Sequence, residues 1–202
     1  LHNATKKAKI MTAEILLQNK ADPNCQEEEE DTPLHTATKF IDDEANQAEM
    51  VELLISKGAD IDMKGSLGRT ALHFVAINAR IQTAEMLLLY NADPNCQDEK
   101  KDTPLHLATI FIDDEAEQTE MVELLIAKGA SLDVTGNRQM TPLQLATERA
   151  RIRAALIMYR NDPLFQFAAE DGGTEVLLHR NNDSCLGLFR DLFRDCFSLD
   201  QA

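Results

Sequence analysis

The chain has 202 residues, of which 44% are hydrophobic and 27% are charged, so it can bury a sizeable core. The 35 acidic residues outnumber the 20 basic ones, which gives a formal net charge of −15 at pH 7. This excess argues against nucleic-acid binding, which usually needs a basic face, and against docking on anionic lipid. No apolar run approaches the roughly 20 residues that a membrane helix needs.

The sequence contains an internal repeat that begins with Thr32-Pro33-Leu34-His35. Related stretches begin at Thr70, Thr103 and Thr141, and Leu1-His2 matches the end of an earlier copy. The leucines at 1, 34, 72, 105 and 143 are 33, 38, 33 and 38 residues apart, so two repeats form a unit of 71 residues. This pattern indicates duplication of a two-repeat block, which a compact enzyme domain would not show.

Each repeat is predicted to begin with a short helix. Thr32 is a good N-cap, Pro33 suits the first helical position, and Leu34 and Ala37 then form a small inward face. The histidine of this motif recurs at the same position of each repeat, which predicts a structural role rather than a metal site.

A second helix is predicted around Met50, Leu53 and Leu54, whose spacing is typical of a buried helical stripe. Gly58 and Gly129 follow at the point where this helix should end and φ should become positive. A pair of such helices has too little core alone, so neighbouring repeats must stack as a solenoid.

The two signatures in phase resemble those of the ankyrin repeat family. The second signature is present as Lys57-Gly58-Ala59-Asp60-Ile61-Asp62 and again at 128–133. The resemblance covers residues 1–160, as about five repeats with the first truncated. It implies an all-α solenoid of stacked helix-turn-helix units with β-hairpin fingers, no enzymatic activity and no cofactor. Because the chain starts inside a repeat, we expect it to be a fragment of a longer protein.

Two repeats depart from the family pattern by five extra residues between their helices, within 40–49 and 111–120. One interpretation is a longer first helix whose Phe and Ile pack on the neighbouring repeat, and the other is a ledge that contacts a partner. The glycine usual before the first helix is replaced by Glu30 and Lys101, which predicts unusual turns at these fingers.

Residues 161–202 are predicted to form a degenerate repeat followed by C-terminal capping helices. The apolar residues between Leu186 and Phe197 are spaced as a stripe on one helix, which could cover the open end of the array. The alternative is an exposed Phe-rich helix that docks on a partner groove or on the parent protein.

The sequence offers no catalytic or metal-binding constellation. No Gly-rich phosphate loop and no nucleophile elbow is present. Cys25 and Cys96 are two repeats apart, which is too far for a disulfide, and Cys185 and Cys196 are eleven residues apart on one predicted helix. Such thiols favour a reducing compartment, so we expect an intracellular protein of the cytoplasm or nucleus.

Acidic residues concentrate in one half of each duplicated unit. Residues 21–62 hold 13 acidic and 2 basic side chains, and the equivalent stretch 92–133 holds 11 and 3. Proteins of the resembled family generally bind through a concave surface of finger tips and first-helix faces. Carried onto this sequence, the candidate partner-binding residues are Glu28, Glu29, Asp31, Lys39, Leu67, Arg69, Ile77, Asn78, Glu99, Lys100, Asp102, Ile110, Arg138 and Met140.

These observations predict a monomeric, non-enzymatic module that binds a Lys/Arg-rich segment of a partner protein, with no nucleic acid and no membrane involved. An inhibitor similar to the NF-kappa-B inhibitors is one version, because Thr141-Pro142-Leu143-Gln144-Leu145 resembles a degenerate last repeat of that kind. The alternative is a regulatory or targeting segment of a larger enzyme, channel or toxin. A third possibility is structural packing within a parent protein or homo-oligomer.

Overall fold

The computed structural model describes residues 1–27, 30–149 and 152–161. The predicted C-terminal cap at 161–202 therefore lies outside the described residues, apart from Asn161, which ends the last described helix. None of the described helices has the length and apolarity needed to cross a membrane.

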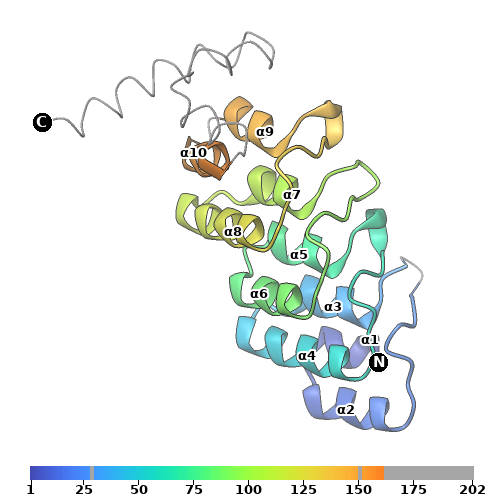
Figure 1. The fold of residues 1–202 in the computed structure, drawn as a ribbon. Helices are drawn as coiled ribbons and strands as arrows, with labels where there is room; N and C mark the ends of the chain where they lie inside the picture. Colours follow the sequence, from blue (N-terminus) through green and yellow to red (C-terminus); the bar gives the residue numbers. More distant parts are fainter. Residues whose placement is uncertain (28–29, 150–151, 162–202) are drawn as a thin grey trace, which may run out of the picture.

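The helices form two layers that run along the array (Figure 1). Each helix packs on the other helix of its repeat and on the corresponding helix of the next repeat, as predicted for a stacked solenoid. The first helices of the repeats are α1 (His2–Lys6), α3 (Pro33–Phe40), α5 (Ala71–Ile77), α7 (Pro104–Phe111) and α9 (Pro142–Glu148). The second helices are α2 (Ile10–Gln18), α4 (Glu44–Ser56), α6 (Ile81–Leu89), α8 (Glu115–Ala127) and α10 (Ile152–Asn161).

The threonine and histidine of the repeat motif fix the start of α3, α5 and α7, and Gln144 takes the place of the histidine in α9. Thr32 has extended backbone, and its hydroxyl accepts the amide of His35, while Pro33 occupies the first turn. The histidine ring bonds back to the amide of the threonine, which completes a capping box. The same arrangement begins α5, α7 and α9, so the predicted helix starts are confirmed.

The second helices end at residues in the left-handed region, also as predicted. Gly58 has φ of 90° and Gly129 has φ of 91°, while Asn91 takes this place after α6 with φ of 65°. This conformation lets the amide of Ala59 reach the carbonyl of Leu54 at 3.0 Å, which satisfies an otherwise open carbonyl of the last turn.

The core is a continuous row between the two layers. Leu34, Leu72 and Leu105 of the first helices and Met50 and Met121 of the second helices have side chains with 1% exposure or less. Each repeat thus contributes a few apolar side chains, and only stacking completes the core.

Most of the extra residues of the longer repeats extend the second helix. The first helices α3 and α7 have 8 residues against 7 in α5, so the expected longer first helix accounts for one residue only. Helices α4 and α8 have 13 residues each, against 9 in α2 and α6. Asp43 and Asp114 cap these long helices by accepting backbone amides. The isoleucine that directly follows the first helix of each long repeat, Ile41 or Ile112, is buried as expected.

The fingers are loops rather than paired strands in the described part of the chain. One finger contains a 3₁₀ turn, η1 (Ser66–Gly68), and another contains η2 (Asn137–Gln139). The amide of Gly65 donates to the carbonyl of Arg69 at 2.8 Å and closes the first of these loops.

The fingers that lack the usual glycine keep a left-handed turn residue. Glu30 has φ of 63° and Lys101 has φ of 66°, close to the 66° of Gly68 at the equivalent position. The predicted unusual turn is therefore absent at Lys101, where a lysine holds a backbone conformation that glycine adopts at lower cost.

Candidate partner-binding surface

The fingers and the exposed side chains of the first helices together form one side of the array, which we call the finger surface (Figure 1). The candidates fall into four groups by burial. Leu67, Asn78, Glu99, Lys100 and Arg138 are exposed, and Lys39, Arg69, Ile77, Ile110 and Met140 are partly buried. Asp31 and Asp102 are buried, and Glu28 and Glu29 lie outside the described residues.

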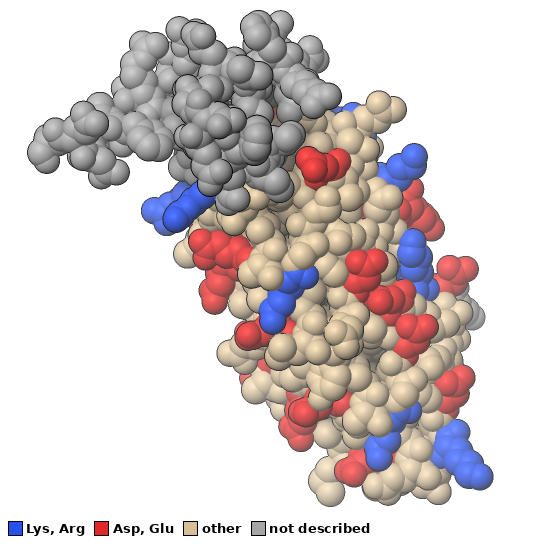
Figure 2. Space-filling model, in the orientation of Figure 1, with Lys and Arg blue, Asp and Glu red and all other residues tan. Residues whose placement is uncertain are grey.

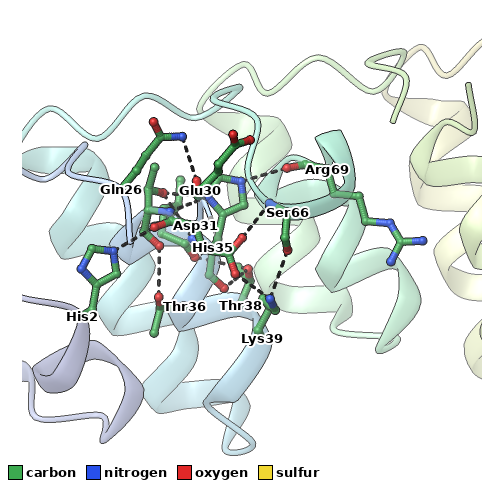
Figure 3. Close-up of polar contacts among 12 residues, drawn as sticks. His2, Gln26, Glu30, Asp31, His35, Thr36, Thr38, Lys39, Ser66 and Arg69 are labelled. Atoms are coloured by element: carbon green, nitrogen blue, oxygen red, sulfur yellow. Dashed lines mark hydrogen bonds and ion pairs between the residues drawn. The ribbon is translucent and has the colours of Figure 1, made fainter. Parts of the chain in front are cut away.

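Asp31 is not an exposed tip residue, contrary to the sequence-based expectation. Its side chain binds Lys39 Nζ at 2.5 Å and the amide of Ser66 in the next finger at 2.9 Å (Figure 3). Burial alone would raise the pKa of this carboxyl, but these donors outweigh it and hold the pKa below its ordinary value. Asp31 therefore joins two neighbouring repeats.

Asp102 is also buried, at 3% exposure, and holds the next finger through its bond to the amide of Asn137 at 2.8 Å. Both aspartates are predicted tip residues that the structure turns inward. The exposed acidic side chains of the described fingers are instead Glu27, Glu30 and Glu99.

Arg69 is partly buried because it bonds to Asp98 of the following finger, with Nε and Oδ2 3.3 Å apart. The amide of Glu99 also donates to the carbonyl of Leu67 at 3.0 Å. Adjacent fingers are thus tied by an ion pair and a backbone hydrogen bond, which makes the finger surface a preorganised one.

The repeat histidines have the structural role that the sequence predicted. Thr32 donates its backbone N–H to Nδ1 of His35, so the ring proton lies on Nε2, which donates to the carbonyl of Arg69 at 2.9 Å. His73 and His106 make the same bonds to Asp102 and Met140. The described residues contain no group of histidine, cysteine and acidic side chains that could hold a metal ion.

Burial keeps these histidine rings neutral. It lowers the pKa of His35 and His106, and it lowers the pKa of His73 to about 4. An imidazolium ring could not accept the threonine amide at Nδ1, so the neutral form is the one that fits the capping box.

Cys25 and Cys96 are free and partly buried at equivalent places of two repeats. Burial, together with the carboxylates of Asp62 and Asp93, raises the pKa of Cys96 to about 11. Because the thiolate is the nucleophilic form, this cysteine is poorly suited to catalysis.

Two aromatic residues of the finger surface are exposed, a point that the sequence did not decide. Phe40 and Phe111 are 44% and 49% exposed, and Leu67 on the finger between them is 52% exposed. The sequence leaves two interpretations open for the phenylalanines, packing on the neighbouring repeat or contact with a partner, and their exposure excludes full burial in the core. The only signal for their exposure is their position as the last residue of a first helix.

Acidic side chains are spread along the array, with basic side chains among them (Figure 2). Asp42 and Asp43 follow Phe40 within three residues, and Asp113 and Asp114 follow Phe111 in the same way. All four aspartates are exposed. The finger surface therefore combines separated apolar side chains with exposed carboxylates at the turns between helices, and with charges of both signs at the fingers, where Lys64, Lys100, Lys101 and Arg138 are also exposed.

Comparison with known proteins identifies the repeats. A family model described as "Ankyrin repeats (3 copies)" matches residues 1–98 and 75–166. An ankyrin repeat protein of fowlpox virus is 31% identical over 150 residues, which cover 71% of this chain and 41% of the viral protein. Human ankyrin repeat and SOCS box protein 16 is 36% identical over 48% of this chain and 20% of its own length.

A third similar protein is an ion channel. Subfamily A member 1 of the transient receptor potential cation channels of Drosophila melanogaster is 27% identical over 79% of this chain, which is 14% of the channel. This chain thus spans less than half the length of each of these relatives.

Proposed function

This chain belongs to the ankyrin repeat family, and we propose that it binds a partner protein on its finger surface and performs no chemistry itself. Ankyrin repeats are generally protein-interaction modules, and their fold is not an enzymatic one. The proposal adds where the partner binds and what kind of segment the partner presents.

The observation that supports the proposal most is the exposure of Phe40, Leu67 and Phe111 on one surface. Exposed aromatic and large aliphatic side chains are costly in water and are typical anchors of protein interfaces. They come from two first helices and the finger between these helices, which neighbouring contacts hold in place. A rigid surface loses little conformational entropy on binding.

The charge of this surface favours a partner segment with lysine or arginine beside apolar residues. Glu27, Glu30 and Glu99 are exposed at the fingers, and exposed aspartates follow both phenylalanines. Such charges would steer a basic segment to the surface and raise the association rate, while the apolar anchors would supply most of the affinity.

The test compares two charge-reversal variants of the full chain as bait in native lysate, read by quantitative mass spectrometry. The finger variant carries Glu27→Lys, Glu30→Lys and Glu99→Lys. Its matched control carries Glu49→Lys, Glu52→Lys and Glu123→Lys on exposed positions of second helices, so both variants change the net charge equally.

We expect a protein that the wild type and the control capture and the finger variant loses, and we expect its capture to weaken as salt rises. Equal loss from both variants would show that only net charge matters, which would overturn the assignment to the finger surface. Capture that depends on neither variant would overturn the electrostatic part.

A second candidate function is regulation or targeting within a larger protein. The relevant observation is that the matching stretch makes up 14% of the channel and 41% of the viral protein. In this case the partner surface would lie in the same polypeptide. Cross-linking of the full-length gene product, with intramolecular links mapped to the fingers, would distinguish this arrangement from binding of a separate protein.

A further inference from the structure

The two duplicated halves of the array contain the same buried carboxylate. Asp31 and Asp102 are 4% and 3% exposed, and in each case Oδ1 accepts the amide of the next finger, at 2.9 Å from Ser66 and 2.8 Å from Asn137. A glycine precedes each of these donors. A Cβ on Gly65 or Gly136 would lie less than 3.0 Å from the carboxylate, so glycine lets the finger approach.

In the first copy, the second carboxylate oxygen holds an ammonium group. Lys39 Nζ lies 2.5 Å from Asp31 Oδ2 and 3.2 Å from the hydroxyl of Ser66 (Figure 3). The same nitrogen lies 5.1 Å from the centre of the Phe74 ring. A primary ammonium at this place is thus held by a carboxylate, a side-chain oxygen and an aromatic face.

In the second copy, the lysine is replaced. Ile110 stands where the first copy has Lys39, and no ion pair among the described residues includes Asp102. No described side chain donates to Asp102 Oδ2 either, while the bond of Oδ1 to Asn137 holds the carboxylate as in the first copy. Asp102, at 3% exposure, therefore keeps a carboxylate oxygen to which no described side chain donates, and this distinguishes it from Asp31, which binds Lys39.

We propose that Asp102 accepts the ammonium group of a lysine side chain that the partner protein inserts into the finger surface. At the equivalent positions of the second copy, Asn137 replaces Ser66 and carries an amide oxygen, Leu145 replaces Phe74, and Ile110 offers apolar contact for the methylene stem of the lysine. This inference rests on the proposed function, because the lysine comes from the partner. Asp102 would thus contact the partner directly, whereas the exposed carboxylates of the finger surface attract the partner at long range.

The test exchanges the residues at the two equivalent positions, Lys39 and Ile110. Ile110→Lys gives the second site its own ammonium, and Lys39→Ile opens the first site. The probe is n-butylammonium chloride, titrated into the uniformly ¹⁵N-labelled full chain at constant ionic strength, with n-butanol as the uncharged control. The signals to follow are the backbone amides of Asn137 and Ser66, each of which donates to one of the two carboxylates.

In the wild type we expect a saturable shift of the Asn137 amide and none of the Ser66 amide, with no response to n-butanol. Ile110→Lys should abolish the Asn137 shift, and Lys39→Ile should create one at Ser66. An Asn137 amide that does not respond in the wild type, or responds equally in Ile110→Lys, would overturn the proposal.

The titration needs no partner, so it can fail or succeed independently of the proposed function. A finger-dependent partner without an ammonium response at Asn137 would contradict this site alone. An ammonium response without any captured partner would contradict the proposed function alone. If the partner binds the finger surface and Asp102 accepts its lysine, Ile110→Lys should reduce capture of the partner at least tenfold.

Discussion

The buried histidines couple the stability of the array to pH. His73 is fully buried, its Nδ1 accepts the amide of Thr70 at 3.1 Å, and its pKa is lowered to about 4. In the unfolded chain, the pKa of this ring returns to about 6.5. Between these values the unfolded state binds the proton and the folded state does not, so stability falls as pH falls through this window.

We predict that the free energy of unfolding decreases between pH 7 and pH 4.5, with His73 contributing up to about 3 kcal/mol. His73→Gln should weaken this dependence, because Gln144 already forms the same capping box with Thr141 in the last repeat. Urea denaturation at a series of pH values measures the effect. A pH dependence that is unchanged in His73→Gln would contradict the role assigned to this ring.

At the residue scale, the sequence predicted roles that depend on neighbours within one repeat. The N-cap threonines, the structural role of the histidines and the left-handed Gly58 follow from local chemistry, and all are confirmed. The burial of Asp31 and Asp102 did not follow, because each carboxylate is held by a finger 35 residues further along the chain. The repeat pattern shows that an aspartate recurs at this position, but it does not show whether its side chain is buried or exposed.

At the element scale, the fingers store backbone strain where glycine is missing. Lys101 has φ of 66°, a conformation that costs a residue with a Cβ about 1 kcal/mol. We predict that Lys101→Gly raises the free energy of unfolding by roughly 0.5–1 kcal/mol. Lys100→Gly removes the same charge at a neighbouring position without positive φ, and it should lower stability. Thermal denaturation of both variants checks the sign, and stabilisation by Lys100→Gly would contradict this explanation.

Each of the longer second helices contains a buried glutamine that binds backbone carbonyls, a contact that the sequence did not predict. Gln118 is buried in α8, and its Nε2 donates to the carbonyls of Thr109 and Ile112 at 3.2 and 3.0 Å. These carbonyls lie at the end of α7, where the last turn of a helix lacks internal partners. Gln47 does the same for Ile41 at 2.9 Å in the other long repeat.

We predict that Gln118→Leu destabilises the array by about 1–3 kcal/mol, since it leaves buried carbonyls without a donor. Glu120→Leu, at an exposed position two residues away, should change stability by no more than about 0.5 kcal/mol. The difference between the two midpoints of chemical denaturation measures the effect. Equal midpoints would show that the glutamine does not stabilise this junction.

Element boundaries were the least predictable part of the fold. For the five extra residues per long repeat the sequence allows a longer first helix or a ledge that contacts a partner, because the insertion begins apolar and becomes acidic. The helix instead ends at Phe40, and Asp43 caps a new helix that begins at Glu44. An aspartate can cap a helix or lie in solvent, so composition alone could not decide where the added turn belongs.

For the whole molecule, the stacked architecture followed from repetition alone. Two signatures recurring in phase predict one structural unit per repeat, and a unit too small for its own core must stack on its neighbours. The finger surface is harder to predict from the sequence, because its residues can be identified only when the exposure of each side chain is known. Of the residues that carry the proposed binding, Leu67 was predicted from its finger position, whereas the exposure of Phe40 and Phe111 came from the structure.

The central claim is that the partner binds across the finger surface, and site-specific photo-cross-linking tests it most directly. A benzophenone side chain would replace Phe111 on the finger surface or Leu89 at the end of a second helix, two exposed apolar positions with 49% and 63% exposure. After irradiation in native lysate, we predict an adduct of defined mass from position 111 and none of that mass from position 89. An adduct from position 89 with none from position 111 would contradict the claim.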